Sequence, residues 1–166
     1  MIRRILSFAI LAALPMQAAA ASPGIEAWRL VDASQAIIED MGHQIDADHD
    51  GMISADEMDR AAREVFAAID TDLDGVLTRG ELFGWKVGMA EIAAFRGREQ
   101  AYAATMNLVF DLLDRDGSNG LDAEEHAGGL VAARAMADRD GDGTMSLAEF
   151  RDAFLVSTAF RRALVE

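Results

Sequence analysis

The 166-residue chain contains no cysteine. This absence excludes disulfide-stabilised folds, thiolate metal sites, cysteine nucleophiles and lipoprotein anchors, because each of them requires a thiol. Basic residues are also scarce, since 15 Lys and Arg stand against 29 Asp and Glu, for a formal net charge of −14. A surface of this sign repels polyanions, so we expect no nucleic-acid partner.

Long hydrophobic runs are lacking as well, except near the N-terminus. An apolar run over residues 5–14 follows Arg3 and Arg4 and precedes small residues at 18–21, which is the layout of a secretory signal peptide. A membrane anchor is the alternative, but this run is much shorter than the ~20 residues that a spanning helix needs. We therefore predict a signal peptide over residues 1–21, a mature domain over 22–166, a periplasmic or secreted location, and no membrane association after cleavage.

The chain is rich in acidic residues that follow a repeated pattern. Four segments, which we call loops one to four, span residues 46–57, 70–81, 114–125 and 138–149. Each has acidic or hydroxyl side chains at positions one, three and five and Glu at position twelve. Position six is Gly in three loops and Asn119 in loop three, and both residue types tolerate the positive φ of a sharp turn. Oxygen atoms at this spacing suit Ca²⁺, a hard cation that takes six to eight oxygen ligands.

In these residues the chain resembles the EF-hand superfamily. The resemblance implies an all-α fold of four helix-loop-helix motifs, short β-bridges between paired loops at the apolar position eight, and up to four Ca²⁺ ions as cofactors. The expected ligands are the side chains at positions one, three, five, nine and twelve and the carbonyl oxygen at position seven. They are Asp46, Asp48, Asp50, Met52, Ser54 and Glu57 in loop one; Asp70, Asp72, Asp74, Val76, Thr78 and Glu81 in loop two; Asp114, Asp116, Ser118, Gly120, Asp122 and Glu125 in loop three; and Asp138, Asp140, Asp142, Thr144, Ser146 and Glu149 in loop four.

Loop three differs from the others at two ligand positions. Ser118 replaces the carboxylate at position five, and Asp122 at position nine restores one. Each loop therefore keeps four acidic ligands. We expect loop three to bind its ion with a different affinity, because ligand charge and rigidity set the affinity of such sites.

The spacing between the loops predicts how they are arranged. Loops one and two begin 24 residues apart, as do loops three and four, whereas loops two and three begin 44 residues apart. The short interval leaves room for one shared helix, which places adjacent loops at its opposite ends. The long interval fits two helices that break at Gly97, so we predict that loop two pairs with loop three and loop one with loop four. The expected helices span residues 25–44, 58–69, 82–96, 98–113 and 147–164.

The signal peptide and the loop spacing also resemble the lanmodulin family of periplasmic lanthanide-binding proteins. That family has Pro at loop position two, where this chain has Ala47, Thr71, Arg115 and Arg139. It also has Asp at position nine, which only Asp122 matches. The neutral hydroxyl groups of the other loops suit a divalent ion, so we favour Ca²⁺ and keep a lanthanide-binding protein as the alternative.

The remaining residues indicate binding rather than catalysis. The sequence has no nucleophile elbow, HExxH motif or phosphate-binding loop, so we expect no enzyme. His43, His49 and His126 are scattered, which argues against a histidine metal site. Methionines are suited to line an apolar groove for a protein or peptide partner. The chain would then act as a Ca²⁺ buffer or as a Ca²⁺-dependent sensor, two roles that differ in how far the helices open.

Overall fold

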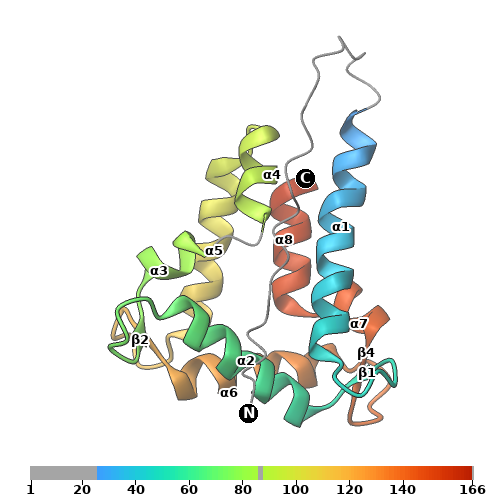
Figure 1. Ribbon diagram of the computed structural model, residues 1–166, viewed down its shortest axis with the longest axis vertical. Helices are drawn as coiled ribbons and strands as arrows, with labels where there is room; N and C mark the ends of the chain where they lie inside the picture. The colour runs from blue at the N-terminus through green and yellow to red at the C-terminus, as the bar shows by residue number, and fades with distance from the viewer. Residues whose placement is uncertain (1–25, 86–87, 166) are drawn as a thin grey trace, which may run out of the picture.

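Helices dominate the fold. The computed structural model describes residues 26–85 and 88–165, and the expected signal peptide lies outside the described residues. The helices are α1 (Glu26–Ile45), α2 (Ala55–Ile69), α3 (Arg79–Gly84), α4 (Met89–Phe95), α5 (Glu99–Leu113), α6 (Ala123–Ala137), α7 (Leu147–Asp152) and α8 (Leu155–Val165). The strands are β1 (Met52–Ile53), β2 (Val76–Leu77), β3 (Leu121–Asp122) and β4 (Met145–Ser146). The predicted all-α class is confirmed (Figure 1), and no helix in these ranges is long and apolar enough to cross a membrane.

The loops pair as their spacing predicts. Antiparallel strands β1 and β4 join loops one and four, with Ile53 opposite Met145. Strands β2 and β3 join loops two and three, with Leu77 opposite Leu121. Helix α2 leads from loop one to loop two, and α6 leads from loop three to loop four. Figure 1 shows the two loop pairs at the lower left and lower right of the molecule, with α2 and α6 between them.

Each helix that leaves a loop begins with a capping box. In loop one, the N-cap Ser54 accepts a hydrogen bond from the backbone N–H of Glu57, whose side chain accepts one from the backbone N–H of Ser54. The same reciprocal pair occurs in the other three loops. Such a box satisfies two N–H groups that the first helical turn leaves without a partner. The position-nine residue therefore fixes where each exit helix starts.

Two expected helices are interrupted in the structure. The single helix predicted over 82–96 is wrong, because α3 ends at Gly84 and α4 starts after Gly88, whose φ of +84° is left-handed. The helix predicted over 147–164 is also wrong, because the chain turns at Ala153 between α7 and α8. This turn stacks Phe154 on Phe150 with 5.1 Å between ring centroids. The predicted break at Gly97 is confirmed by its φ of +64°.

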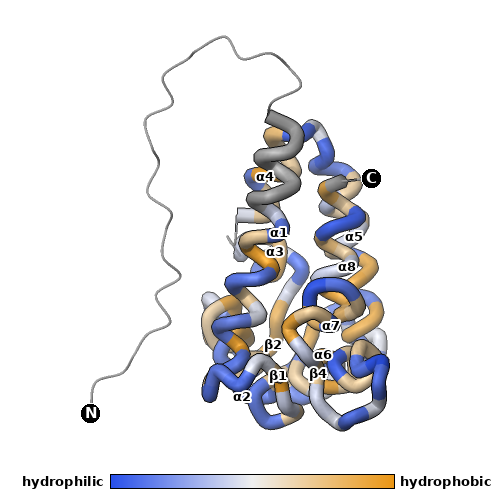
Figure 2. Tube along the Cα trace, turned by 90° about the vertical axis from the view of Figure 1, so that its right-hand side faces the viewer, coloured by the Kyte–Doolittle hydropathy of each residue, from blue (hydrophilic) through white to orange (hydrophobic). Residues whose placement is uncertain are grey.

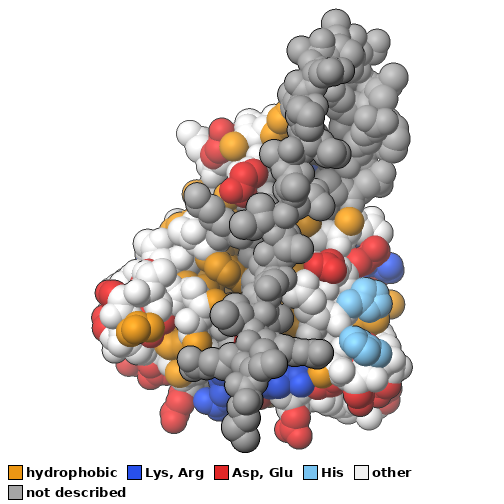
Figure 3. Space-filling view, viewed as in Figure 1, with side chains coloured by type: hydrophobic (Ala, Val, Ile, Leu, Met, Phe, Trp, Pro, Cys, Tyr) orange, Lys and Arg blue, Asp and Glu red, His pale blue; other side chains and the backbone are white. Residues whose placement is uncertain are grey.

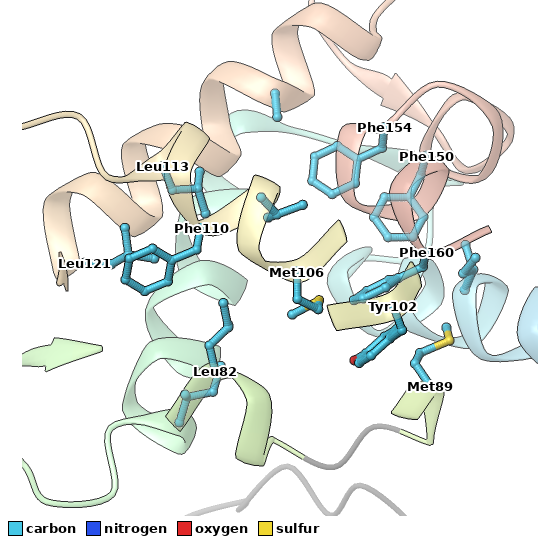
Figure 4. Packing of buried hydrophobic residues seen from close by; sticks show 14 of the residues in the cluster. Leu82, Met89, Tyr102, Met106, Phe110, Leu113, Leu121, Phe150, Phe154 and Phe160 are labelled. Atoms are coloured by element: carbon cyan, nitrogen blue, oxygen red, sulfur yellow. The ribbon is translucent and has the colours of Figure 1, made fainter. Parts of the chain in front are cut away.

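The core connects both loop pairs to the upper helices. Tyr102 of α5 stacks on Phe160 of α8, with 6.0 Å between ring centroids, next to the buried Met89 and Met106 (Figure 4). The apolar residues at loop position eight reach the same core and are 0% exposed; they are Ile53, Leu77, Leu121 and Met145. Hydrophilic residues concentrate in the loops at the base (Figure 2). The buried bridges therefore fix the loops to the helices.

His126 of α6 is buried where α6 packs on α2. Its side chain is 4% exposed and meets Phe66 edge-on, with 5.8 Å between ring centroids. Burial lowers the pKa of His126 to about 4, although a hydrogen bond to the backbone of Ala62 favours its protonated form. Above this pH the folded chain holds the imidazole uncharged.

We predict that the metal-free protein loses stability as the pH falls from 7 to 5. The unfolded chain takes up a proton on this histidine near pH 6.5, whereas folded His126 resists until about pH 4, so the unfolded state binds more protons in this window. The expected loss is about 2 kcal/mol of unfolding free energy. Urea unfolding in EDTA at both pH values measures it.

The variants His126→Phe and His43→Gln isolate the responsible group. The first removes the buried imidazole and should lose much less stability over this pH range. The second changes an exposed histidine and should behave like the original chain. Equal losses in the original chain and in His126→Phe would contradict the prediction.

Candidate metal centre

Each loop gathers three carboxylates around one point. The side chains at positions one, three and twelve place one oxygen each within 4.8 Å of one another. The clusters are Asp46, Asp48 and Glu57; Asp70, Asp72 and Glu81; Asp114, Asp116 and Glu125; and Asp138, Asp140 and Glu149. Acidic side chains accordingly lie along the lower edge of the molecule (Figure 3). The structure thus brings together half of the predicted ligand positions in all four loops.

The backbone at position six shapes each cluster from within the loop. Gly51, Gly75 and Gly143 have φ between +82° and +91°, and Asn119 has +64°. This left-handed turn directs each backbone N–H to the carboxylate at position one, at distances of 2.9 to 3.1 Å. The tolerance of Asn for this conformation lets loop three close like the others.

The glutamate at position twelve closes each loop. Its Oε1 accepts a hydrogen bond from the backbone N–H at position two, at 2.8 or 2.9 Å. Its Oε2 accepts one from the N–H at position nine, at 2.9 to 3.3 Å. Both carboxylate oxygens therefore face the loop interior and its first turn, as a ligand that reaches back from the exit helix must.

These hydrogen bonds stabilise the ionised glutamates. N–H groups of Thr78 and Thr71 lower the pKa of Glu81 from 4.5 to about 2. N–H groups of Arg139 and Ser146 lower the pKa of Glu149. Such carboxylates stay charged at neutral pH, which is the form that binds a cation.

The other predicted ligand positions are arranged differently. The position-five carboxylates of Asp50, Asp74 and Asp142 each accept a hydrogen bond of 2.8 Å from the N–H at position seven. In loop three, Ser118 Oγ donates to the carbonyl oxygen of Gly120, at 3.1 Å. The position-nine side chains act as helix N-caps. The three-carboxylate clusters found in the described ranges do not include Asp50, Asp74, Asp122 or Asp142. Ligation at positions five, seven and nine stays a prediction.

The sequence contained a signal for the N-cap role that the ligand interpretation overlooked. Ser or Thr followed three residues later by Glu is the pattern of a capping box. It occurs at Ser54, Thr78 and Ser146 with their position-twelve glutamates, and Asp122 replaces the hydroxyl in loop three. The position-nine oxygen is thus engaged with the exit helix, in addition to any contact with an ion.

The clusters fit a hard cation. All of the potential ligand atoms in these clusters are carboxylate oxygens, and none of the four groups found among the described residues includes a histidine. Asp46 is only 1% exposed and Asp70 only 8%, although a buried carboxylate without a countercharge is unfavourable. Asp70 Oδ1 is also buried, and no described residue forms a hydrogen bond with it. A cation bound among the three carboxylates of a loop would compensate both the buried negative charge and the missing hydrogen bond.

Repulsion within loop four leads to the same conclusion. The N–H of Asp142 lowers the pKa of Asp140, but repulsion from the carboxylates of Asp142 and Glu149, together with desolvation, raises it overall. Like charges at this spacing disfavour ionisation. A divalent ion would turn that repulsion into attraction.

Comparison with known proteins agrees with this geometry. The sequence profile of the family described as EF hand matches residues 43–61 and 135–155, which contain loops one and four. No curated protein matches the chain. Loops two and three were not matched by the profile, yet they have the same cluster, the same turn and the same closing glutamate. The two profile matches, together with four loops of one design joined in two pairs, support an EF-hand protein.

Proposed function

We propose that the chain is an exported calcium-binding protein in which each of the four loops binds one Ca²⁺. The observation that carries the proposal is the recurrence of one three-carboxylate cluster in all four loops. Calcium prefers oxygen ligands, accepts irregular geometry and takes both oxygens of a glutamate. Magnesium demands a near-ideal octahedron and retains its waters, so it suits these open loops less well.

Replacing the position-twelve glutamate should weaken one loop at a time. We expect Glu57→Gln and Glu125→Gln to lower the Ca²⁺ affinity of loops one and three, respectively, on the order of 100-fold, because each loses one negative ligand at contact distance. Calorimetric titration with Ca²⁺, Mg²⁺ and La³⁺ measures the effect. Replacing all four glutamates should abolish binding.

Matched controls change the same charge one residue earlier. Asp56→Asn and Glu124→Gln alter exposed side chains at position eleven, outside the clusters, and should reduce affinity by less than about threefold. If the controls were as damaging as the glutamate variants, net charge and not ligation would explain the binding. A preference for La³⁺ by many orders of magnitude would favour the lanthanide-binding alternative.

An apolar cavity supports a sensor role. It has a volume of about 130 Å³ and lies between helices attached to both loop pairs. Its lining includes Met58 of α2, Met106 of α5 and Leu130 of α6. Because α2 and α6 each start at one loop and end at another, a change of loop shape alters the angle of helices that line this cavity. Binding of Ca²⁺ would then change the apolar surface offered to a protein or peptide partner.

A fluorescent dye that binds apolar surface tests this role. We expect its fluorescence to rise several-fold when Ca²⁺ saturates the protein, because opened helices expose the cavity lining. The variant lacking all four position-twelve glutamates should show no rise. An unchanged signal in the calcium-saturated original chain would assign the buffer role instead.

Export is supported by the N-terminal sequence. Two arginines, an apolar run and small residues stand in the order of a secretory signal. We expect the full-length chain, produced in a bacterium with a periplasm, to lose about 20 or 21 residues, as intact-mass measurement of the periplasmic fraction would show. Leu11→Arg interrupts the apolar run and should leave the chain unprocessed, whereas Leu11→Ile should be processed. Recovery of both variants at full length would contradict export.

A further inference from the structure

Arg134 of α6 is a buried positive charge that has no acidic partner within residues 26–85 and 88–165. Its side chain is 7% exposed, and none of the ion pairs found in the described ranges includes it. Its Nη1 donates to the carbonyl oxygen of Gly143 at 3.0 Å, and its buried Nε has no hydrogen-bond partner among the described residues. A guanidinium keeps its charge inside a protein, and arginine is almost never buried unless paired. The position of this charge therefore needs an explanation.

The guanidinium lies directly beside loop four. Gly143, whose carbonyl it contacts, donates its own N–H to Asp138 Oδ2 at 2.9 Å. Asp138 belongs to the three-carboxylate cluster of that loop. Gly143 therefore contacts both the buried guanidinium and Asp138, the first expected ligand of loop four.

Corresponding positions beside the other loops carry no charge. The carbonyl oxygen of Arg134 accepts a hydrogen bond from the N–H of Asp138, the first residue of loop four. The same bond links the first residue of each other loop to the residue four places earlier. Those residues are Gly42, Phe66 and Phe110. Because the bond shows that the four positions are equivalent, only loop four has a charged residue at this position. The arginine nearest loop one is the exposed Arg60, which donates to the carbonyl oxygen of Ile45 at 3.0 Å.

Loop one, which pairs with loop four, is the more acidic of the two. Loop one contains five acidic residues and no basic one, whereas loop four contains four acidic residues and Arg139. The two loops share the β1–β4 bridge and a further hydrogen bond from Leu147 N to Gly51 O, at 3.2 Å. Arg134 adds to a difference that the sequences of the two loops already contain.

We propose that Arg134 makes loop four the weaker calcium site of this pair and weakens it further for ions of higher charge; the inference rests on the proposed calcium binding. Repulsion between a fixed positive charge and a bound cation grows in proportion to the charge of the cation. Because the guanidinium is buried, salt screens this repulsion less than it would at the surface. Loop one fills first, and loop four responds at higher calcium concentration.

Selective ¹⁵N labelling of glycine follows the loops separately. Gly51, Gly75 and Gly143 occupy position six of loops one, two and four, and each N–H contacts the first carboxylate of its loop. Titration of the signal-free protein with CaCl₂ or LaCl₃ then gives one dissociation constant per loop. In the original chain, loop four should bind Ca²⁺ more weakly than loop one, and its preference for La³⁺ over Ca²⁺ should be smaller than that of loop two.

Arg134→Met removes the charge and keeps an unbranched side chain. We expect the dissociation constant of loop four to fall about tenfold for Ca²⁺ and about 30-fold for La³⁺, because the removed repulsion scales with ion charge. Loop two should change less than about twofold, since it belongs to the other loop pair and bridges to loop three. Arg134→Lys keeps the charge and should leave loop four nearly unchanged. Arg162→Met removes an exposed charge on α8 and should alter no loop.

Several results would overturn the proposal. They are an unchanged loop four in Arg134→Met, equal gains for Ca²⁺ and La³⁺, or an equal gain in Arg134→Lys. If Arg134→Met fails to fold, the comparison of loops two and four in the original chain decides, and equal La³⁺ preferences there refute the role of Arg134. Binding of Ca²⁺ to no loop at all would instead refute the proposed function.

Discussion

The closing contact of the glutamate at loop position twelve is the interaction on which the rest of the structure depends. One oxygen accepts from the N–H at position two, and the other accepts from the N–H at position nine. The first contact brings the two ends of the loop together, and the second starts the exit helix through the capping box. One side chain therefore shapes both the cluster of carboxylates and the direction of the helix that leaves it.

The closed loops in turn position the helices. Closing a loop brings its position-eight residue to the bridge with its partner, where Ile53 meets Met145 and Leu77 meets Leu121. All four residues are buried in the same core as the aromatic residues of α5, α7 and α8. A change at one cluster can therefore reach the core through a single apolar side chain. This path is short because each bridge contains only two residues per strand.

The sequence predicted the features that depend on local chemistry. The carboxylate spacing identified the loops, and Asn119 was expected to adopt the left-handed turn. The intervals between the loops predicted that loop two pairs with loop three and loop one with loop four. The interruptions near Gly88 and Ala153 were missed, because they arise where α4 and α8 turn to pack on α5. Burial of His126 and Arg134 was also unpredictable, since their neighbours come from α2 and loop four only after the chain has folded.

The pairing of loop one with loop four, and of loop two with loop three, makes the two halves of the chain interdependent. Loops one and two lie in the first half and loops three and four in the second, yet each strand finds its partner in the other half. The loops recur with a period of 68 residues, and exchanging the two halves converts one bridge into the other. This is the symmetry of a dimer with two identical subunits. Two copies of a two-loop subunit would give this arrangement if they were joined into one polypeptide, because the two strands of each copy pair with strands of the other copy and not with each other.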